Sequence, residues 1–380
     1  MFLRLFCVNS NYKRVSRQRT CLICGKPDWC SYTPDAKISF CARIVTNADR
    51  VSRTGWGVFY HEKSLFDEYS LPFPVNPPPK KAELAPIEIR DFAYRKLIAL
   101  SPATAFSEVT DGAKGLRNRQ ILNFEDFGSI PPTIKERREL ANTIRAAINR
   151  YFPDYVRKFK SSISGVPGFW IDENGKSQLW SAKNYQSPLM LIPYRNSSGM
   201  IQACQIRFMN RSDETEVRYV WLSTPKKSGG VSCGCPIHFV RPLPVTFSLN
   251  KPFLVTEGAL KGETVQKFYP QYNVIAIGGV ASSQQELIKA TRFFPLIIAF
   301  DNDYSSNAQV LRQLVRLIRA RFSDAHKYNY NPDFSFLSWS SDFNGIDDAI
   351  LNIQKIEMVS FAKWINNIDS TLQSEFSDFM

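Results

Sequence analysis

The sequence has no apolar run near the ~20 residues that a membrane-spanning helix needs, which argues against an integral membrane protein. Its start, Met1–Val8, is apolar but short and contains Arg4, so we expect no signal peptide and a cytoplasmic location. The chain also lacks a G-x4-G-K-[ST] motif, so it encodes no ATP-driven motor of that kind. Acidic residues are scarce: 35 Asp and Glu stand against 48 Lys and Arg, and the net charge of +13 favours a polyanionic partner, either nucleic acid or an anionic membrane.

The composition is that of a folded protein with more than one domain. At roughly 150 residues per domain, 380 residues correspond to two or three domains. The hydrophobic share of 44% is enough to bury a core, and the charged share of 22% argues against wholesale disorder. We find no internal repeat.

Four of the eight cysteines fall within 21 residues: Cys21, Cys24, Cys30 and Cys41. Two thiolates separated by two residues can hold one side of a tetrahedron, and two more complete a structural zinc site without an open coordination position. Because no export signal is present, we favour zinc over the alternatives, which are two disulfides or free thiols. His61 could replace one of the four ligands.

A second group, Cys233, Cys235 and His238, has no clear fourth ligand. We interpret it as a glycine-containing turn with incidental thiols rather than as a second metal site.

The segment around the cysteine cluster is basic and rich in aromatic residues. Residues 1–64 hold eleven Lys and Arg against four acids, with seven aromatic side chains from Tyr12 to Tyr60 between them. This pattern favours contact with single-stranded nucleic acid; the alternative is a solvated basic face with the aromatic rings in a small core. Residues 70–86 contain six prolines and predict an extended linker.

Helices and then strands are predicted after the linker. A helix is expected over 87–100, and an amphipathic helix over 133–151 with Ile134 and Tyr151 on its apolar side. Residues 165–250 show the pattern of β-strands joined by turns. From Pro252 strands and helices alternate, which predicts a mainly parallel sheet with helices on both faces. The expected strands are Phe253–Thr256, Asn273–Ile277, Leu296–Phe300 and Phe334–Trp339, and Ser283 to Glu286 resembles a capping box.

Acidic residues follow these predicted strands at the point where each strand ends. Glu257 follows the first strand, Asp301 and Asp303 follow the third, and Asp347 and Asp348 follow the fourth. Because the carboxyl ends of parallel strands meet at one edge of a sheet, we expect these carboxylates to converge. Carboxylate oxygens suit Mg²⁺ or Mn²⁺, and such a site serves phosphoryl-transfer chemistry. The alternative is that Asp301 and Asp303 are ordinary loop and helix-cap residues.

The segments Glu257–Lys261, Ala276–Val280 and Phe300–Asp303 together resemble the TOPRIM domain of bacterial-type primases, topoisomerases and some nucleases. Gly345–Asp348 is similar to the last acidic motif of primase-like members. Upstream, the segment 115–128 and the positions around Arg207 and Arg218 resemble the amino-terminal part of a bacterial primase core. The resemblance is to primase-like replication proteins of plasmids, phages or other mobile elements, and it covers most of residues 20–350.

The resemblance implies an α/β protein of five parts. These are a zinc-ribbon-like nucleic-acid-binding module (1–69), a proline-rich linker (70–87), a mixed α+β primase-like region (88–250), a TOPRIM domain (251–352) and a carboxyl-terminal helical tail (353–380). Two departures from the family pattern stand out: Lys261 takes a position where cellular primases usually carry an acid, and the zinc module has four cysteines where those enzymes typically use one histidine.

The resemblance implies a DNA primase, a nucleotidyltransferase that synthesises short RNA primers on single-stranded DNA from ribonucleoside triphosphates. It implies zinc as a structural cofactor and Mg²⁺ or Mn²⁺ as a catalytic one, with a replicative helicase supplied in trans and no membrane partner. A metal-dependent TOPRIM nuclease and a non-catalytic single-strand-binding or recruitment protein remain the alternatives. The implied magnesium ligands are Glu257, Asp301, Asp303 and Asp347; Glu257, Asp301, Asp303 and Lys261 are the expected catalytic residues, and Arg207, Arg218 and Lys261 are expected to hold nucleotide or template phosphates.

Overall fold

The computed structural model describes residues 12–16, 18–35, 37–46, 48–52, 55–61, 83–159, 163–182, 187–210, 217–243, 251–302, 307–367 and 373. The chain divides into two compact units, Met1–Pro77 and Pro78–Met380, which we call unit 1 and unit 2. Residues 70–82 of the predicted linker and residues 368–372 and 374–380 of the predicted tail lie outside the described ranges. No described helix is both long and apolar enough to cross a membrane.

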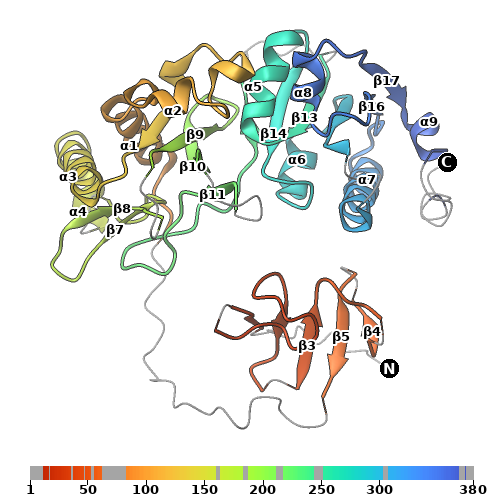
Figure 1. The fold of residues 1–380 in the computed structure, drawn as a ribbon, viewed down its shortest axis with the longest axis horizontal. Helices are drawn as coiled ribbons and strands as arrows, with labels where there is room; N and C mark the ends of the chain where they lie inside the picture. Colours follow the sequence, from red (N-terminus) through yellow and green to blue (C-terminus); the bar gives the residue numbers. More distant parts are fainter. Residues whose placement is uncertain are drawn as a thin grey trace. The chain divides into compact units, whose positions relative to one another are not determined.

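Unit 1 is a small antiparallel sheet built around the clustered cysteines (Figure 1). Its buried centre consists of Val15, Tyr32 and three cysteines, with Phe59 packed against them. A core this small stabilises little by itself, so the fold depends on what the cysteines bind. The strand order is β1-β2-β3-β5-β4, with β1 Lys13–Arg14, β2 Ser31–Tyr32, β3 Ile38–Cys41, β4 Arg50–Val51 and β5 Gly57–Tyr60.

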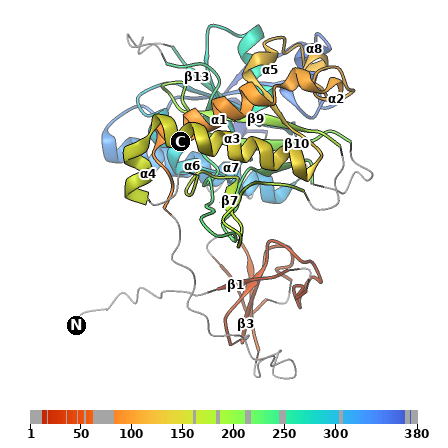
Figure 2. The same ribbon diagram turned by 90° about the vertical axis from the view of Figure 1, so that its left-hand side faces the viewer.

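Unit 2 begins with helices packed on an antiparallel sheet. Helix α1 covers Ile87–Leu100, as predicted, and lies beside α3, Ile134–Tyr151 (Figure 2). The sheet has the order β11-β10-β9-β6 and a buried core against α1 and α3. Its strands are β6 Gly128–Ile130, β9 Leu189–Arg195, β10 Ile201–Phe208 and β11 Tyr219–Trp221. Strands β7 Phe169–Ile171 and β8 Ser177–Leu179 form a separate hairpin. Short helices lie between α1 and β6 (η2 Ala103–Ala105, α2 Ser107–Thr110, η3 Arg117–Arg119 and η4 Phe124–Asp126), and α4 Pro153–Phe159 follows α3.

The limits of α3 were predicted well, and so was the middle of its apolar side, where Ile144 and Ile148 are buried, but not its two ends. Thr133 caps the helix by accepting a hydrogen bond from the Glu136 backbone amide. Ile134 and Tyr151 were expected on the buried side, and both are exposed in the first and last turns of the helix, whose middle packs against α1 and β8. The buried side instead includes Arg137, whose guanidinium donates to the carbonyl oxygens of residues 131 and 132.

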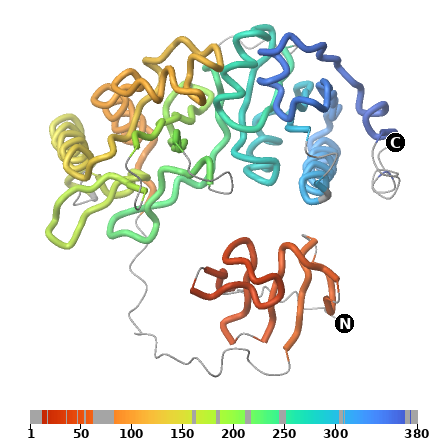
Figure 3. Tube along the Cα trace, in the orientation of Figure 1, coloured from red at the N-terminus to blue at the C-terminus, as the bar shows by residue number. Residues whose placement is uncertain are grey.

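The second half of unit 2 is the predicted α/β sheet, now with six strands. Four central strands run parallel in the order β14-β13-β15-β16, and antiparallel strands β12 and β17 form the edges. Figure 3 shows the last part of the chain returning to this sheet, where β17 pairs with β16. The strands are β12 His238–Phe239, β13 Phe253–Glu257, β14 Asn273–Ile277, β15 Leu296–Ala299, β16 Phe334–Ser338 and β17 Glu357–Ser360.

Helices cover both faces of this sheet, and the side chains of each strand alternate between the two faces. Leu254, Val274 and Ile297 point to the face covered by α5 and α8. Val255 and Ile298 belong to the core on the other face, under α6, α7 and α9. The helices are α5 Ala259–Phe268, α6 Gln284–Ala290, α7 Ala308–Tyr328, α8 Ile346–Leu351 and α9 Phe361–Ile365.

The capping box expected at Ser283 does not form. Ser283 precedes α6 with a left-handed backbone, φ 52°, and its hydroxyl makes no capping bond. The hydroxyl instead donates to the carbonyl oxygen of Cys235. A tertiary contact has therefore replaced the local one that the sequence pattern indicated.

Candidate zinc site and acidic edge

The four clustered cysteines come together as the spacing predicted. Their Sγ atoms all lie within 4.8 Å of one another, and no other group of three or more potential ligands in the described residues does so. The Sγ atoms of Cys24 and Cys30 are 3.7 Å apart, and those of Cys30 and Cys41 are 3.9 Å apart. A tetrahedral zinc site with Zn–S bonds of about 2.3 Å has S–S edges of roughly 3.8 Å, whereas a disulfide needs about 2.05 Å. The geometry fits a structural zinc ion and not a pair of disulfides.

Backbone amides support the cysteine sulfurs from outside. The Ala42 amide donates to Cys30 Sγ at 3.4 Å, and the Ile44 amide donates to Cys41 Sγ at 3.3 Å. Burial raises the pKa of Cys30 and of Cys41, while at Cys24 the opposing effect of the Lys26 amide and the neighbouring thiols lowers the pKa to about 7. A bound cation would hold these thiols as thiolates, so ligand binding and the fold of unit 1 are coupled.

The two other candidate metal ligands lie elsewhere. His61 is hydrogen-bonded through Nε2 to the Ser39 hydroxyl at 2.9 Å and is not part of the cysteine cluster. Cys233, Cys235 and His238 form no three-ligand group among the described residues, which agrees with their interpretation as a turn. Gly234 and Cys235 have φ values of 75° and 55°, as a tight turn requires.

The aromatic residues of unit 1 divide into two sets. Tyr32 is buried, but Tyr12, Trp29 and Tyr60 are each about half exposed, at 49%, 55% and 49%. The guanidinium of Arg50 lies over the Tyr60 ring, 5.8 Å from its centre. The sequence left open whether these rings contact single-stranded nucleic acid or fill a small core, and each interpretation describes one set. The buried ring lies in the core, whereas the exposed rings lie beside positive charge, an arrangement that suits stacking of unpaired bases.

In unit 2 the acidic residues meet at the carboxyl edge of the parallel strands. Glu257 ends β13, and Asp301 lies just beyond the neighbouring strand β15. The Asp301 backbone amide donates to Glu257 Oε1 at 3.4 Å, so the two residues are in direct contact. Two carboxylates at one sheet edge repel each other unless positive charge lies among them.

Lys261 supplies positive charge to this edge. It lies in the first turn of α5, and its ammonium group forms an ion pair with Asp301 Oδ1. The other carboxylate oxygen, Asp301 Oδ2, accepts a hydrogen bond from Asn344 Nδ2 at 3.2 Å. Asn302 fixes the loop that carries Asn344, because its side chain donates to the carbonyl oxygens of Ser340 and Phe343. Both oxygens of Asp301 thus have partners within the chain.

Asp347 has a cationic partner that sequence reasoning missed. Asp347 is almost fully buried at the start of α8, and its Oδ2 is paired with the guanidinium of Arg119. Arg119 comes from the short helix η3, which is held against α5 by a hydrogen bond from Thr264 Oγ1 to the Arg119 carbonyl oxygen at 3.1 Å. The predicted similarity around Gly115–Arg117 pointed to this segment, but nothing in the sequence singled out Arg119.

The two arginines expected to hold phosphates differ in exposure. Arg207 is buried on β10, where it donates to the Tyr219 hydroxyl at 2.8 Å. Burial lowers the pKa of Arg207. Arg218 is exposed at the start of the adjoining strand.

Asp303, a predicted ligand, lies outside the described residues. Within the described ranges, no three carboxylates approach closely enough to surround one ion. Glu257 and Asp301 still fit the usual mode of Mg²⁺, which binds one or two carboxylates together with substrate phosphates. Asp348 is exposed beside Asp347; partial burial and the Asp347 charge raise its pKa.

Behind the acidic edge, a buried charged cluster joins the two halves of unit 2. Glu263 of α5 is 3.9 Å from both Arg195 Nη1 and His238 Nε2, and it accepts a 2.8 Å hydrogen bond from Arg241. Burial alone would raise the pKa of Glu263, but His238 and the two arginines lower it. Burial lowers the pKa of His238, whose Nδ1 accepts a bond from the Arg195 amide at 2.9 Å.

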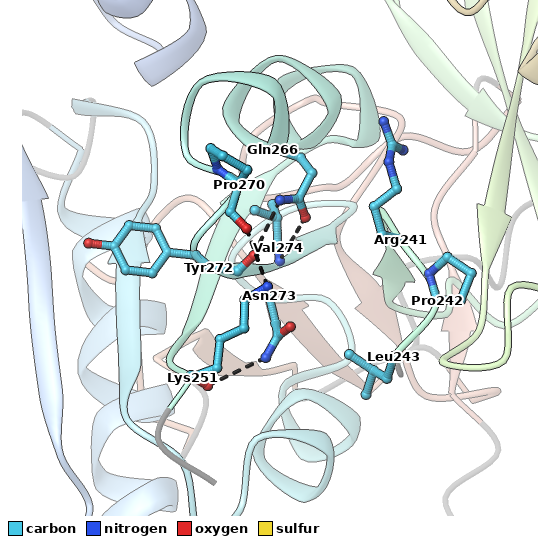
Figure 4. Close-up of a pocket in the computed structure, with 9 residues that line it drawn as sticks. All are labelled: Arg241, Pro242, Leu243, Lys251, Gln266, Pro270, Tyr272, Asn273 and Val274. Atoms are coloured by element: carbon cyan, nitrogen blue, oxygen red, sulfur yellow. Dashed lines mark hydrogen bonds between the residues drawn. The ribbon is translucent and has the colours of Figure 1, made fainter. Parts of the chain in front are cut away.

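The pocket in Figure 4 is separate from the acidic edge. It has a volume of about 310 Å³ and lies where β13 and β14 begin, the end opposite to Glu257. The side chain of Gln266 spans it, donating to the Tyr272 carbonyl at 3.2 Å and accepting from the Val274 amide at 3.4 Å. Its lining residues are thus engaged in holding the end of α5 to the sheet.

No protein-family model and no curated protein matches this chain. Among solved structures, the zinc-binding and RNA polymerase domains of the Aquifex aeolicus primase align over 78% of this chain and 68% of theirs, with 11% identity and a TM-score of 0.46. The RNA polymerase domain of Mycobacterium tuberculosis primase DnaG, in complex with a double-stranded DNA oligomer, aligns over 71% of this chain and 78% of its own, with 14% identity and a TM-score of 0.44. A DnaG primase catalytic domain bound to single-stranded DNA aligns over 74% of this chain and 83% of its own, with 12% identity and a TM-score of 0.42.

Proposed function

We propose that this chain is a DNA primase that synthesises short RNA primers on single-stranded DNA, in the replication of a mobile element or a bacterium. The observation that carries the proposal is the contact between Glu257 and Asp301 at the carboxyl edge of adjacent parallel strands, with the cation Lys261 beside them. The motif resemblance of these segments supports the same reading.

The acidic residues of this edge would bind the metal ion that nucleotidyl transfer requires. Glu257 and Asp301, with Asp303, would hold Mg²⁺ or Mn²⁺, which would neutralise the charge of a triphosphate and assist attack by a 3′-hydroxyl. Asp347, a ligand in the sequence-based expectation, is paired with Arg119 and would add negative charge nearby.

The cations position the phosphates. Lys261 is one-fifth exposed and Arg218 is exposed, so each can reach a phosphate, while Arg207 contributes positive charge from within the sheet.

Unit 1 would grip the template. Its exposed rings and neighbouring arginines provide stacking and backbone contacts that do not depend on base sequence. The zinc ion would hold this surface in shape and take no part in the transfer, because four cysteines leave no coordination position open.

The test uses zinc-loaded full-length protein, single-stranded DNA, Mg²⁺ or Mn²⁺ and labelled ATP with the other ribonucleotides, with and without a replicative helicase. We expect short labelled oligomers from wild type, and at least a hundredfold less from the Asp301→Ala/Asp303→Ala variant. Asp154→Ala, which removes an exposed carboxylate remote in sequence from the acidic edge, is the matched control and retains activity.

Two other outcomes would replace the proposal. Metal-dependent degradation of DNA in the absence of nucleotides identifies a nuclease that uses the same acids. Salt-sensitive DNA binding that survives loss of Asp301 and Asp303, with no product under any condition, identifies a non-catalytic binding protein.

A further inference from the structure

We infer that Lys261 takes the place of a second divalent cation, so that the acidic edge holds a single Mg²⁺ or Mn²⁺ ion. The inference rests on the proposed function for the presence of that one ion. What it adds is the number of ions and the residue that sets this number.

The first observation is that Asp301 already has a cation. Its Oδ1 is paired with the Lys261 ammonium group, and its Oδ2 accepts the bond from Asn344. An aspartate that bridges two metal ions in the usual two-oxygen mode gives one oxygen to each of them. Here one of those oxygens is given to an ammonium group instead, which carries positive charge but brings no coordination shell.

The second observation concerns the space between Asp301 and Asp347. Asp347 Oδ1 is buried and has no hydrogen-bond partner, although Oδ2 is paired with Arg119. A Cβ atom added at Gly345 would lie 2.5 Å from Asp347 Oδ1 and 3.2 Å from Lys261 Nζ. The ammonium group and the unpaired oxygen therefore both border the Gly345 backbone.

These positions place the Lys261 ammonium group beside Asp301 and against the same backbone as the unpaired oxygen of Asp347. A divalent cation entering there would meet the ammonium group at short range, and Arg119 on the far side of Asp347 adds to the repulsion. On the Glu257 side, the contact of Glu257 Oε1 with the Asp301 amide keeps a carboxylate at the edge of the sheet. One ion fits there, completed by water in the free protein and by phosphates once substrate is bound.

The experiment counts bound ions directly. Zinc-loaded full-length protein is titrated with Mn²⁺ without nucleotide or DNA, and free Mn²⁺ is followed by electron paramagnetic resonance. We expect one Mn²⁺ per chain for wild type. Lys261→Glu, which replaces the ammonium group by a carboxylate, is expected to bind two. Lys261→Met, which keeps the length of the side chain without its charge, is expected to bind Mn²⁺ about tenfold more tightly than wild type.

Lys289→Glu makes the same charge change at an exposed position on α6 and is expected to bind one ion with wild-type affinity. Zinc content and thermal unfolding establish that each variant is folded; if Lys261→Glu does not fold, the affinity of Lys261→Met decides. Two ions or none on wild type would overturn the inference, and so would unchanged affinity in Lys261→Met.

Primer synthesis by wild type is measured on the same preparations. One bound ion without any primer would leave the ion count standing and remove the proposed function. Primers made by protein that binds two ions would overturn the ion count and leave the proposed function standing.

Discussion

The cysteine cluster of unit 1 and the acidic edge of unit 2 are assembled in opposite ways. All four cysteines lie within 21 residues, and short strands hold them at the distances that a zinc ion needs. The acidic edge collects Glu257, Asp301 and Asp347 from separate strands and helices, and Arg119 reaches Asp347 across 228 positions of sequence. A local site can be recognised from spacing alone, whereas a site of this second kind exists only once the whole sheet has formed.

The largest effect should come from removing the metal of the local site. Its ligand is the main support of unit 1, because the buried core there is small. Binding of structural zinc by comparable modules is worth about 10–16 kcal/mol, so a strong chelator is expected to unfold unit 1. Unit 2, which has its own extensive cores, should keep its structure.

Limited proteolysis followed by mass spectrometry checks this expectation. After chelation, cleavage sites should appear throughout residues 12–61 and not in residues 83–159. Cys30→Ser should reproduce the effect without chelator, while Cys204→Ser, at a buried cysteine outside the cluster, should leave unit 1 protected. Unit 1 that stays protected without metal would contradict the coupling of zinc and fold.

The same contrast explains what could be predicted from the sequence. The clustering of the four cysteines, the helix at 87–100 and the parallel arrangement of the central strands follow from local spacing and alternation, and the structure confirms them. The edge strands β12 and β17 escaped prediction because they are short and take their place by pairing with strands far away. Ser283 was wrong as a capping residue because a tertiary partner, the Cys235 carbonyl, took its hydroxyl.

At the acidic edge, the sequence indicated the acids and Lys261 but not Arg119. Carboxylates at strand ends form a pattern, whereas an arginine on a short loop helix looks like any solvated basic residue. Arg119 is identified only by its contact with Asp347. The expected burial of Ile134 was likewise wrong, because helical periodicity does not tell where the elements that cover a helix end.

The next largest effect should come from breaking the long-range ion pair. Asp347 is buried, so Arg119→Met leaves a carboxylate without its cation. We expect this variant to lower the free energy of unfolding of unit 2 by about 3 kcal/mol, the usual cost of removing one partner of a buried pair. Chemical denaturation followed by tryptophan fluorescence measures the change.

A double-mutant cycle separates this pair from general damage. Asp347→Asn is expected to be destabilising on its own, and the Arg119→Met/Asp347→Asn double variant should be less destabilised than the sum of the two single changes, by about 1–3 kcal/mol. Strictly additive effects would show that the two side chains do not interact in solution.

A smaller effect is expected from pH at the buried cluster around Glu263. Burial lowers the pKa of His238 below its ordinary value of about 6.5, so the unfolded chain takes up a proton before the folded one does. Glu263, whose pKa is also lowered in the folded state, acts in the same direction at more acidic pH. The free energy of unfolding should therefore fall as pH drops below about 6.5, by up to about 1.4 kcal/mol per pH unit for His238.

Urea unfolding at pH 7.5, 6.0 and 5.0 tests this dependence in wild type and in His238→Gln. Loss of zinc at low pH affects both proteins equally, so the difference between their slopes isolates the imidazole. The variant should be less stable than wild type at pH 7.5 and should lose less stability between pH 7.5 and 6.0. Parallel pH profiles would remove His238 as the cause.

The smallest effect should come from a pair that is local but exposed. Arg157 and Asp154, three residues apart on α4, form an ion pair with side chains 79% and 84% exposed. Asp154→Ala is expected to change the free energy of unfolding by no more than about 0.5 kcal/mol, because water and salt screen such a pair. Chemical denaturation of Asp154→Ala and of Arg119→Met, each at low and at high salt, measures the two changes in the free energy of unfolding. If the two variants were equally destabilised, separation in sequence and burial would both be poor guides to the strength of a contact. The expected difference of several-fold would show that burial decides what a contact contributes, while separation in sequence decides only whether it can be foreseen.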